Sequence, residues 1–348
     1  MYLRDEEKYM QQEIIETTDL LDDRGYVKSP GYARMMRVRY NREKVRTHPF
    51  GLKEWDFYQV LHGDWVMHLT IGHVSYVASI SADLVNLRDG RRAGFNRMRP
   101  LPLRSLPMPC NPETPHTLKV NGKDYSAFYD VDAKRRHLVM KAEDKKAGRV
   151  EIDITIPNNP ENEKMVIVTP FPGNPRQFYL NYKENYWGAE GSAKIGDIEV
   201  EFDNSTVSLM DWGRGVWPFK HEWFWGSGTG WVNDAHFGFN IGWGFGDTSN
   251  ATENFFFYKD KAYKLGMLTV TREENDYMKP WHFISEGNDF DFIMEPVFDN
   301  YTETKLLFVN THCHQVFGNW SGKAVLPDGK ALEIEKLTAF CEHAENRW

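Results

Sequence analysis

The chain has 348 residues, of which 41% are hydrophobic, 14% aromatic and 26% charged, a composition typical of folded globular proteins and not of disordered ones. Its formal net charge of −8 argues against a surface that follows nucleic-acid phosphates, because such surfaces concentrate Lys and Arg. The first residues are acidic where a signal peptide is basic, no apolar run approaches the ~20 residues of a membrane span, and three cysteines are too few for a disulfide framework. We therefore expect a cytoplasmic protein with no membrane span and no nucleic-acid partner.

The hydrophobic pattern of the N-terminal part changes from helical spacing to strand-like runs. Residues 6–21 have loose helical spacing and end at an Asp-Asp-Arg-Gly stop, which predicts a short N-terminal helix or arm. From about residue 34 the chain consists of short runs rich in aromatic and β-branched residues, which are typical of strands. Residues 100–115 contain six of the 17 prolines and predict a long ordered loop or lid.

Strand-like runs continue to the C-terminus, with turn signals between them and almost no helical periodicity. We predict an all-β, antiparallel fold with roughly sixteen to twenty strands. So many strands exceed one small barrel, which favours two barrel-like halves packed together. We place them at residues 1–200 and 201–348.

The most distinctive segment is residues 211–247, which contains six of the 12 tryptophans and nine of the 27 glycines. Glycine costs entropy inside a strand and is found where another group approaches the backbone closely. Alternating Gly with Trp or Phe places rings on one face of a strand, which predicts an aromatic cavity wall. The alternative is that these rings only fill a barrel interior. The residues predicted to form the wall are Trp217, Trp223, Trp225, Trp231 and Trp243.

Charged residues embedded among these rings favour a ligand site, because charges are rarely buried unless they are paired or functional. Asp211 is the candidate general acid, with Arg214 orienting an anion, or the two form a structural salt bridge. His221 is a further candidate, although it and Glu222 face opposite sides of a strand. Asp247 is more typical of a cap or turn.

A second cluster, THCHQ, places His312 and His314 on one face of a strand. A His-x-His pair binds zinc or iron if a third ligand converges. With no further ligand at metal spacing, we instead predict His314 and Gln315 as hydrogen-bonding residues that line the cavity. The sequence also has no phosphate-binding or dinucleotide glycine motif, so we expect neither a metal nor an organic cofactor.

Five stretches of the second half carry a family resemblance: LMDWGRGVWPFKHEWFWGSGTGW, GFNIGWGFGDTSNATEN, YMKPWHF, HQVFGNWSG and the terminal ENRW. Together they resemble a bacterial domain-of-unknown-function family, DUF2804, over most of the chain. That family is distantly similar to the carotenoid 1,2-hydratase, AttH-like and tocopherol cyclase group. The resemblance implies paired lipocalin-like barrels with a hydrophobic cavity. Asp211 would correspond to the Asp of the hydratase-like WMDH pattern. This chain has Trp212 where that pattern has His.

The resemblance also implies cofactor-independent acid–base chemistry. Our leading hypothesis is a hydratase, isomerase or cyclase that acts on a terpenoid- or polyketide-like hydrophobic small molecule, with Asp211 as acid and tryptophan faces stabilising a developing cation. Two other hypotheses remain open. One is a non-catalytic protein that binds lipid or another hydrophobic ligand in the same cavity, and the other is glycan recognition by coplanar tryptophans.

Overall fold

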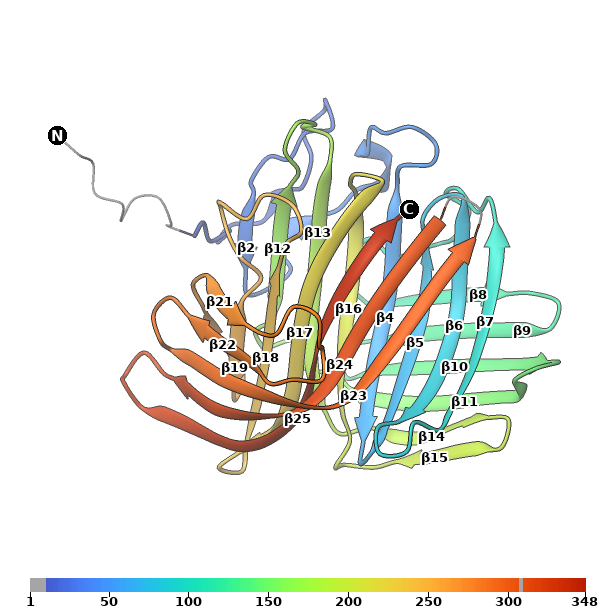
Figure 1. The fold of residues 1–348 in the computed structure, drawn as a ribbon. Helices are drawn as coiled ribbons and strands as arrows, with labels where there is room; N and C mark the ends of the chain where they lie inside the picture. Colours follow the sequence, from blue (N-terminus) through green and yellow to red (C-terminus); the bar gives the residue numbers. More distant parts are fainter. Residues whose placement is uncertain (1–10, 307–308) are drawn as a thin grey trace.

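The computed structural model describes residues 11–306 and 309–348, and most of these residues lie in β-strands (Figure 1). Within these ranges there is no α-helix, and the helical element described is one 3₁₀ turn, η2 (Arg42–Lys44). The all-β prediction is therefore confirmed. No helix in the same ranges is long and apolar enough to span a membrane.

The N-terminal segment is an extended arm rather than a helix over residues 11–21, and residues 6–10 of the predicted helix lie outside the described residues. Strand β1 (Thr18–Asp19) pairs in parallel with β3 (Val38–Arg39). Backbone amides upstream bond to distant segments, such as Gln12 to the carbonyl of Asn250. Of the two predicted forms, helix or arm, the described residues adopt the arm, because these tertiary backbone bonds outweigh a weak local periodicity.

The central layer is an antiparallel sheet of eight strands. In spatial order they are β2 (Gly31–Ala33), β12 (Met165–Pro170), β13 (Phe178–Trp187), β16 (Val207–Val216), β4 (Lys53–His62), β5 (Trp65–His73), β6 (Val77–Asn86) and β7 (Arg92–Pro100). Alternate residues of these strands point to opposite faces of the sheet. Each face is covered by a different layer.

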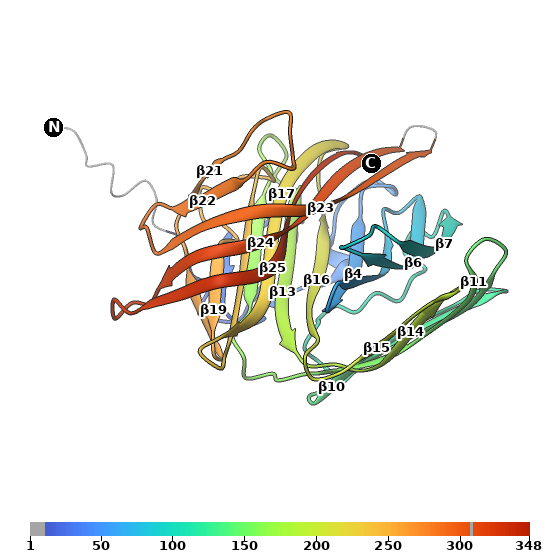
Figure 2. The ribbon, with the colours of Figure 1, turned by 60° about the horizontal axis from the view of Figure 1, so that its bottom comes forward.

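One face packs against a six-stranded sheet, visible as a separate layer in Figure 2. Its strands, in spatial order, are β15 (Ile198–Phe202), β14 (Glu190–Ile195), β11 (Gly148–Pro157), β10 (Arg135–Asp144), β9 (Tyr125–Val131) and β8 (His116–Asn121). The core between these sheets includes Trp212 and Tyr58 from the central sheet and Met140 and Ile152 from the other. Burial of this apolar surface holds the first half together.

The second half is a nine-stranded antiparallel sheet that curls into a half-barrel (Figures 1 and 2). Its strands, in spatial order, are β20 (Lys261–Lys264), β19 (Phe255–Tyr258), β18 (Ala235–Trp243), β17 (Lys220–Val232), β25 (Ala331–Arg347), β24 (Val309–Val325), β23 (Phe290–Leu306), β22 (Trp281–Ser285) and β21 (Leu268–Thr271). Aromatic side chains such as Phe239, Phe283 and Trp320 fill the curl. The predicted all-β architecture of curled antiparallel sheets is thus confirmed, with a half-barrel in the second half.

The two halves meet where the other face of the central sheet packs against β17, β24 and β25. Leu209 and Val66 contact Trp225, Phe317 and Phe340 in one buried cluster. The division of the chain into two domains at residue 200 remains a prediction. In the sheet pairing, β16 lies between β13 and β4, so the chain passes to the nine-stranded sheet between Val216 and Lys220.

The proline-rich segment is a loop between β7 and β8, as predicted. Three arginine side chains donate to its backbone carbonyls: Arg214 to Pro109 at 2.9 Å, Arg136 to Pro112 at 3.0 Å and Arg42 to Leu106 at 2.9 Å. Because Pro removes the amide donors of this loop, its carbonyls are the groups left to bond, and arginine supplies donors for them. These hydrogen bonds therefore hold the loop against the first half.

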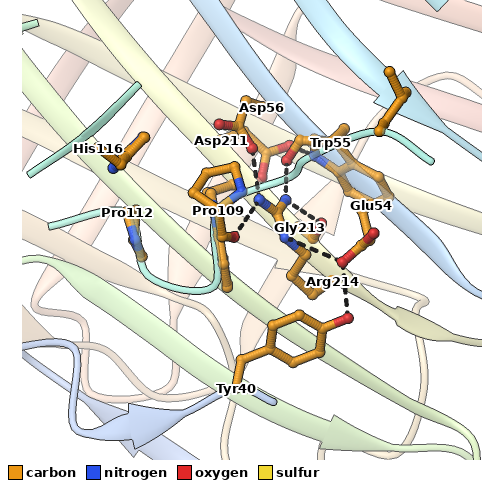
Figure 3. Close-up of polar contacts among 12 residues, drawn as sticks. Tyr40, Glu54, Trp55, Asp56, Pro109, Pro112, His116, Asp211, Gly213 and Arg214 are labelled. Carbon is orange, nitrogen blue, oxygen red and sulfur yellow. Dashed lines mark hydrogen bonds and ion pairs between the residues drawn. The ribbon is translucent and has the colours of Figure 1, made fainter. Parts of the chain in front are cut away.

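Arg214 is the centre of a buried charge network (Figure 3). Its guanidinium lies 2.8 Å from Oδ1 of Asp56 and 3.7 Å from Oε1 of Glu54, and it donates to the carbonyl of Trp55 at 2.6 Å. Burial alone would raise the pKa of Glu54. The hydrogen bond from His73, the charge of Arg214, and the hydrogen bond and charge of Arg42 together outweigh burial and lower that pKa to about 2.

We predict that Arg214→Met lowers the free energy of unfolding by about 3–5 kcal/mol, because it leaves Asp56 buried without its cation and removes one of the two arginines beside Glu54. Urea denaturation followed by circular dichroism measures this loss. The control is Arg149→Met, which removes an exposed ion pair with Glu151 and should cost at most about 1 kcal/mol. Equal losses in the two variants would contradict the role given to Arg214.

Candidate functional site

A cavity of about 420 Å³ opens between the central sheet and the nine-stranded sheet. Residues from β4, β5 and β6 line one side, and residues from β17, β23, β24 and β25 line the other. Its size is within the usual range for small-molecule sites. No residue of the proline-rich loop lines it, so this loop is not its lid.

Asp211 enters the cavity from β16 and is 8% exposed. Its Oδ2 accepts a hydrogen bond from Nε1 of Trp55 at 3.1 Å, and its Oδ1 accepts one from Asn181. Burial raises the pKa of Asp211, while the charge of Lys183 and both donors act in the opposite direction. The result is a desolvated carboxyl group held in a fixed orientation.

Gly213 explains how Trp55 reaches Asp211. The two residues are cross-strand partners on β16 and β4. A Cβ atom at Gly213 would lie 2.3 Å from the indole ring of Trp55. Only glycine leaves room for the ring to cross the β16 backbone, and this placement turns the indole N–H toward the carboxylate.

Glu342 enters the same cavity from β25, on the facing sheet, and is 7% exposed. Its Oε1 accepts from Nε1 of Trp223 at 2.7 Å, and Sγ of Cys313 lies 3.9 Å from Oε2. Burial raises the pKa of Glu342 to about 7, and the negative charge of Asp211 adds to that shift. This carboxyl group is therefore substantially protonated near neutral pH.

A small inner chamber of about 40 Å³ adjoins both carboxyl groups. Lys183 and Glu253 line it as an ion pair with a separation of 2.6 Å, and the Lys183 ammonium lies 4.2 Å from the ring centroid of Trp225. A water molecule needs at least ~10–15 Å³ of such space and two or more polar partners. The chamber has room and partners for water.

His68 and Asp83 form a dyad at the side of the main cavity. Nδ1 of His68 lies 3.0 Å from Oδ2 of Asp83, and Nε2 lies 3.2 Å from Oε1 of Gln59. Because a carboxylate only accepts, Nδ1 carries a hydrogen. Phe57 stacks on the imidazole and fixes its plane.

The structure brings four of the predicted residues to the cavity wall: Asp211, Trp223, Trp225 and Gln315. Two others, Trp217 and His221, pack in an adjacent aromatic cluster instead. His221 donates from Nδ1 to the carbonyl of Pro218, and burial lowers its pKa to about 4. It is therefore neutral at physiological pH.

The remaining four predicted residues do not line the cavity. Arg214 points to the opposite face of β16 and pairs with Asp56, so neither the predicted Asp211–Arg214 salt bridge nor an anion-orienting role is seen. His314 faces away because its neighbour Gln315 faces in, and it pairs with Asp299 at 2.7 Å. Trp231 is 45% exposed near the β17–β18 turn, and Trp243 stacks on Phe224.

Sequence reasoning missed Glu342, His68, Asp83 and Trp55. The last three lie on strands of the first half, which the glycine and tryptophan pattern did not single out. Glu342 follows Phe340 and Cys341 in a strand whose two faces look alike in sequence. A usable signal was the single carboxylate among apolar neighbours in TAFCEHA.

Metal ligation has no support in the described ranges. Within residues 11–306 and 309–348, no group of three His, Cys, Asp or Glu side chains is arranged to hold a metal ion. His312 lies 3.1 Å from the hydroxyl of Tyr301 and 3.2 Å from Glu303. These are ordinary hydrogen-bond and ion-pair contacts.

The family described as Domain of unknown function (DUF2804) matches residues 11–348, and the chain belongs to it, as the sequence predicted. Kievitone hydratase from Nectria haematococca has a similar fold, with a TM-score of 0.52 and 12% identity over 89% of this chain and 92% of that one. An AttH-like protein from Nitrosomonas europaea gives 0.47 and 9% over 87% and 94%. A search of curated protein sequences finds no match. At these identities the likeness concerns the fold alone.

The raised pKa of Glu342 makes a prediction about stability. The folded state favours the protonated carboxyl of Glu342. Burial of this group therefore does not destabilise the fold at a pH below its ordinary pKa of 4.5, and the destabilisation is complete at a pH above its folded-state pKa of about 7. Stability should fall across this window by roughly 3 kcal/mol relative to Glu342→Gln. Denaturant unfolding at several pH values measures the difference.

The control for this experiment is Glu335→Gln, which changes an exposed carboxylate on the same strand. Its stability should follow that of the wild type at every pH. If Glu342→Gln also follows the wild type between pH 4.5 and 7, then Glu342 is not desolvated in the way described.

Proposed function

We propose that this protein is a hydratase-type acid–base enzyme that uses no organic cofactor and acts on a hydrophobic small molecule. One observation carries the proposal. Two buried carboxyl groups, Asp211 and Glu342, enter one aromatic cavity from facing sheets, each with an indole N–H donor. Pairs of carboxyl groups in different environments are a common arrangement for acid–base catalysis.

The two groups have different roles in the proposal. Glu342 has the pKa of about 7 and donates its proton to one carbon of a substrate double bond. Burial raises the pKa of Asp211, while its interactions with Lys183, Asn181 and Trp55 oppose that shift and favour the charged form, and we assign it the acceptance of a proton from water. This gives Asp211 the part of the base rather than that of the acid.

The steps balance without a further reactant. The proton from Glu342 forms the new C–H bond and leaves a carbocation at the neighbouring carbon. Water adds to that carbon and gives one of its protons to Asp211, so the product is an alcohol. Transfer of a proton from Asp211 to Glu342, directly or through solvent, restores the starting state.

The surroundings fit this chemistry. Trp223 and Trp225 line both the main cavity and the inner chamber, and ring faces stabilise nearby positive charge. The inner chamber adjoins both carboxyl groups and has room for the reacting water. The main cavity then receives the apolar body of the substrate.

Hydration is preferred over isomerisation or cyclisation because of this water chamber. The fold shared with kievitone hydratase supports the same choice, since that protein is a hydratase. The proposal for this chain is limited to the reaction class and to an apolar substrate with a carbon–carbon double bond.

The test is incubation of the protein with a panel of apolar compounds that carry a trisubstituted double bond, in water enriched in oxygen-18, followed by mass spectrometry. A hydrated product should contain the heavy oxygen. We expect Asp211→Asn and Glu342→Gln each to lower turnover by about 10²–10⁴-fold. The control Glu335→Gln should keep wild-type turnover.

Binding and turnover separate the proposal from its main rival. Compounds bound with equal affinity by wild type, Asp211→Asn and Glu342→Gln, with no product from any of them, would identify a non-catalytic binding protein. A product formed at wild-type rate by both variants would refute the acid–base assignment. In a parallel incubation in deuterium oxide, deuterium incorporation without a hydrated product would point to isomerisation by the same pair.

A further inference from the structure

Four exposed apolar side chains lie on neighbouring loops and strand ends at one end of the first half. They are Phe50, Met98, Leu101 and Leu103, which are 46%, 46%, 62% and 41% exposed. We call this set the apolar rim. Exposed clusters of large apolar side chains on a folded protein commonly mark an interaction surface.

The rim is continuous with the mouth of the cavity. Met98 belongs to the cavity lining and is the cross-strand partner of Ser79, while Pro100 pairs with Val77, another lining residue. Leu101 follows directly after Pro100. An apolar molecule that leaves the cavity at this side therefore meets the rim.

Leu101 and Leu103 are held in an unusual backbone conformation. Both have a φ of 49°, in the left-handed region that residues with a side chain rarely adopt. Their amides donate to the carbonyls of Tyr76 and Ser75, each at 2.8 Å. The first half thus fixes two leucines outward at a conformational cost, which is a pattern found at functional surfaces.

The loop that precedes β4 completes the rim. The ring of Phe50 packs edge-on against Tyr76 at a centroid distance of 6.4 Å. A groove of about 420 Å³ lies between this loop and the proline-rich loop, lined by residues that include His48, Pro49 and Leu103. Figure 1 shows the segment before β4 and the end of β7 at the same end of the molecule.

The segments around the rim are positively charged, whereas the chain as a whole is negatively charged. Residues 41–52 and 97–104 contain six Arg or Lys residues and one Glu, whereas the whole chain carries −8. Arg42, Lys44 and Arg97 are used in ion pairs within the first half, and Arg104 lies 3.9 Å from Glu43. Arg46 and Arg104 are exposed and Arg99 is half-buried, so basic groups flank the apolar side chains at the surface.

We propose that the apolar rim docks onto an anionic lipid surface, from which the cavity takes up its ligand. Apolar side chains that insert at the headgroup boundary, together with basic residues that attract anionic lipid, are the two contributions that peripheral membrane binding needs. An apolar ligand partitions into lipid, so a cavity mouth at the lipid surface receives it without exposure to water.

The test is flotation with extruded vesicles of phosphatidylcholine alone or with about one-third phosphatidylglycerol. We expect the wild type to float with the anionic vesicles at low salt and to be released at high salt. The double variant Leu101→Ser/Leu103→Ser should bind roughly tenfold more weakly. Serine at exposed positions removes apolar surface without opening a cavity, and thermal unfolding checks that the variant is folded.

The matched control is Met267→Ser/Met278→Ser, which removes two side chains of similar exposure, 41% and 44%, one directly before β21 and one in the loop between β21 and β22. In Figure 1, β21 and β7 lie on opposite sides of the molecule. The control should bind vesicles as the wild type does. Equal weakening in both double variants, or no wild-type binding to anionic vesicles, would refute the proposal.

Two further outcomes have a definite meaning. Sedimentation that shows a wild-type dimer, lost in Leu101→Ser/Leu103→Ser but kept in the control, would assign the rim to a second copy of the chain and overturn lipid docking. The vesicle experiment contains no substrate, so its failure is distinct from a failure of the proposed hydratase activity.

Discussion

Strand β16 is buried on both faces along all ten residues, and the site depends on this constraint. In a strand, neighbouring side chains point to opposite faces, so Asp211 and Gly213 face one layer while Trp212 and Arg214 face the other. The first pair builds the cavity wall. The second pair fixes the strand to the six-stranded sheet and to the proline-rich loop. One short sequence, DWGR, thus holds the first half together and positions a carboxyl group for chemistry.

The site exists only where the halves meet. Asp211 comes from the central sheet and Glu342 from β25, and each carboxyl group is oriented by an indole N–H. Desolvation of two carboxyl groups is unfavourable for folding, and the apolar contacts between Leu209, Phe317 and Phe340 offset that cost nearby. The same dry surroundings that raise the pKa of Glu342 allow it to act as an acid near neutral pH.

The sequence predicted the fold class, the family and the strand that carries Asp211, because strand periodicity and glycine-aromatic alternation are local signals. It also predicted Trp223, Trp225 and Gln315 at the cavity. It did not predict Glu342 or His68, since their positions depend on which sheets pack together. Arg214 was misplaced for a related reason: its partners Asp56 and Glu54 lie on β4, about 160 residues earlier, and nothing local reveals that pairing.

The central claim is that Glu342 is a protonated, desolvated acid facing Asp211. The most direct measurement is an infrared difference spectrum between wild type and Glu342→Gln, recorded as a function of pH. The account predicts a carboxylic-acid C=O stretch that is lost in the variant and titrates with a midpoint of about 7. A difference spectrum that shows only carboxylate bands down to a pH of about 5 would contradict it.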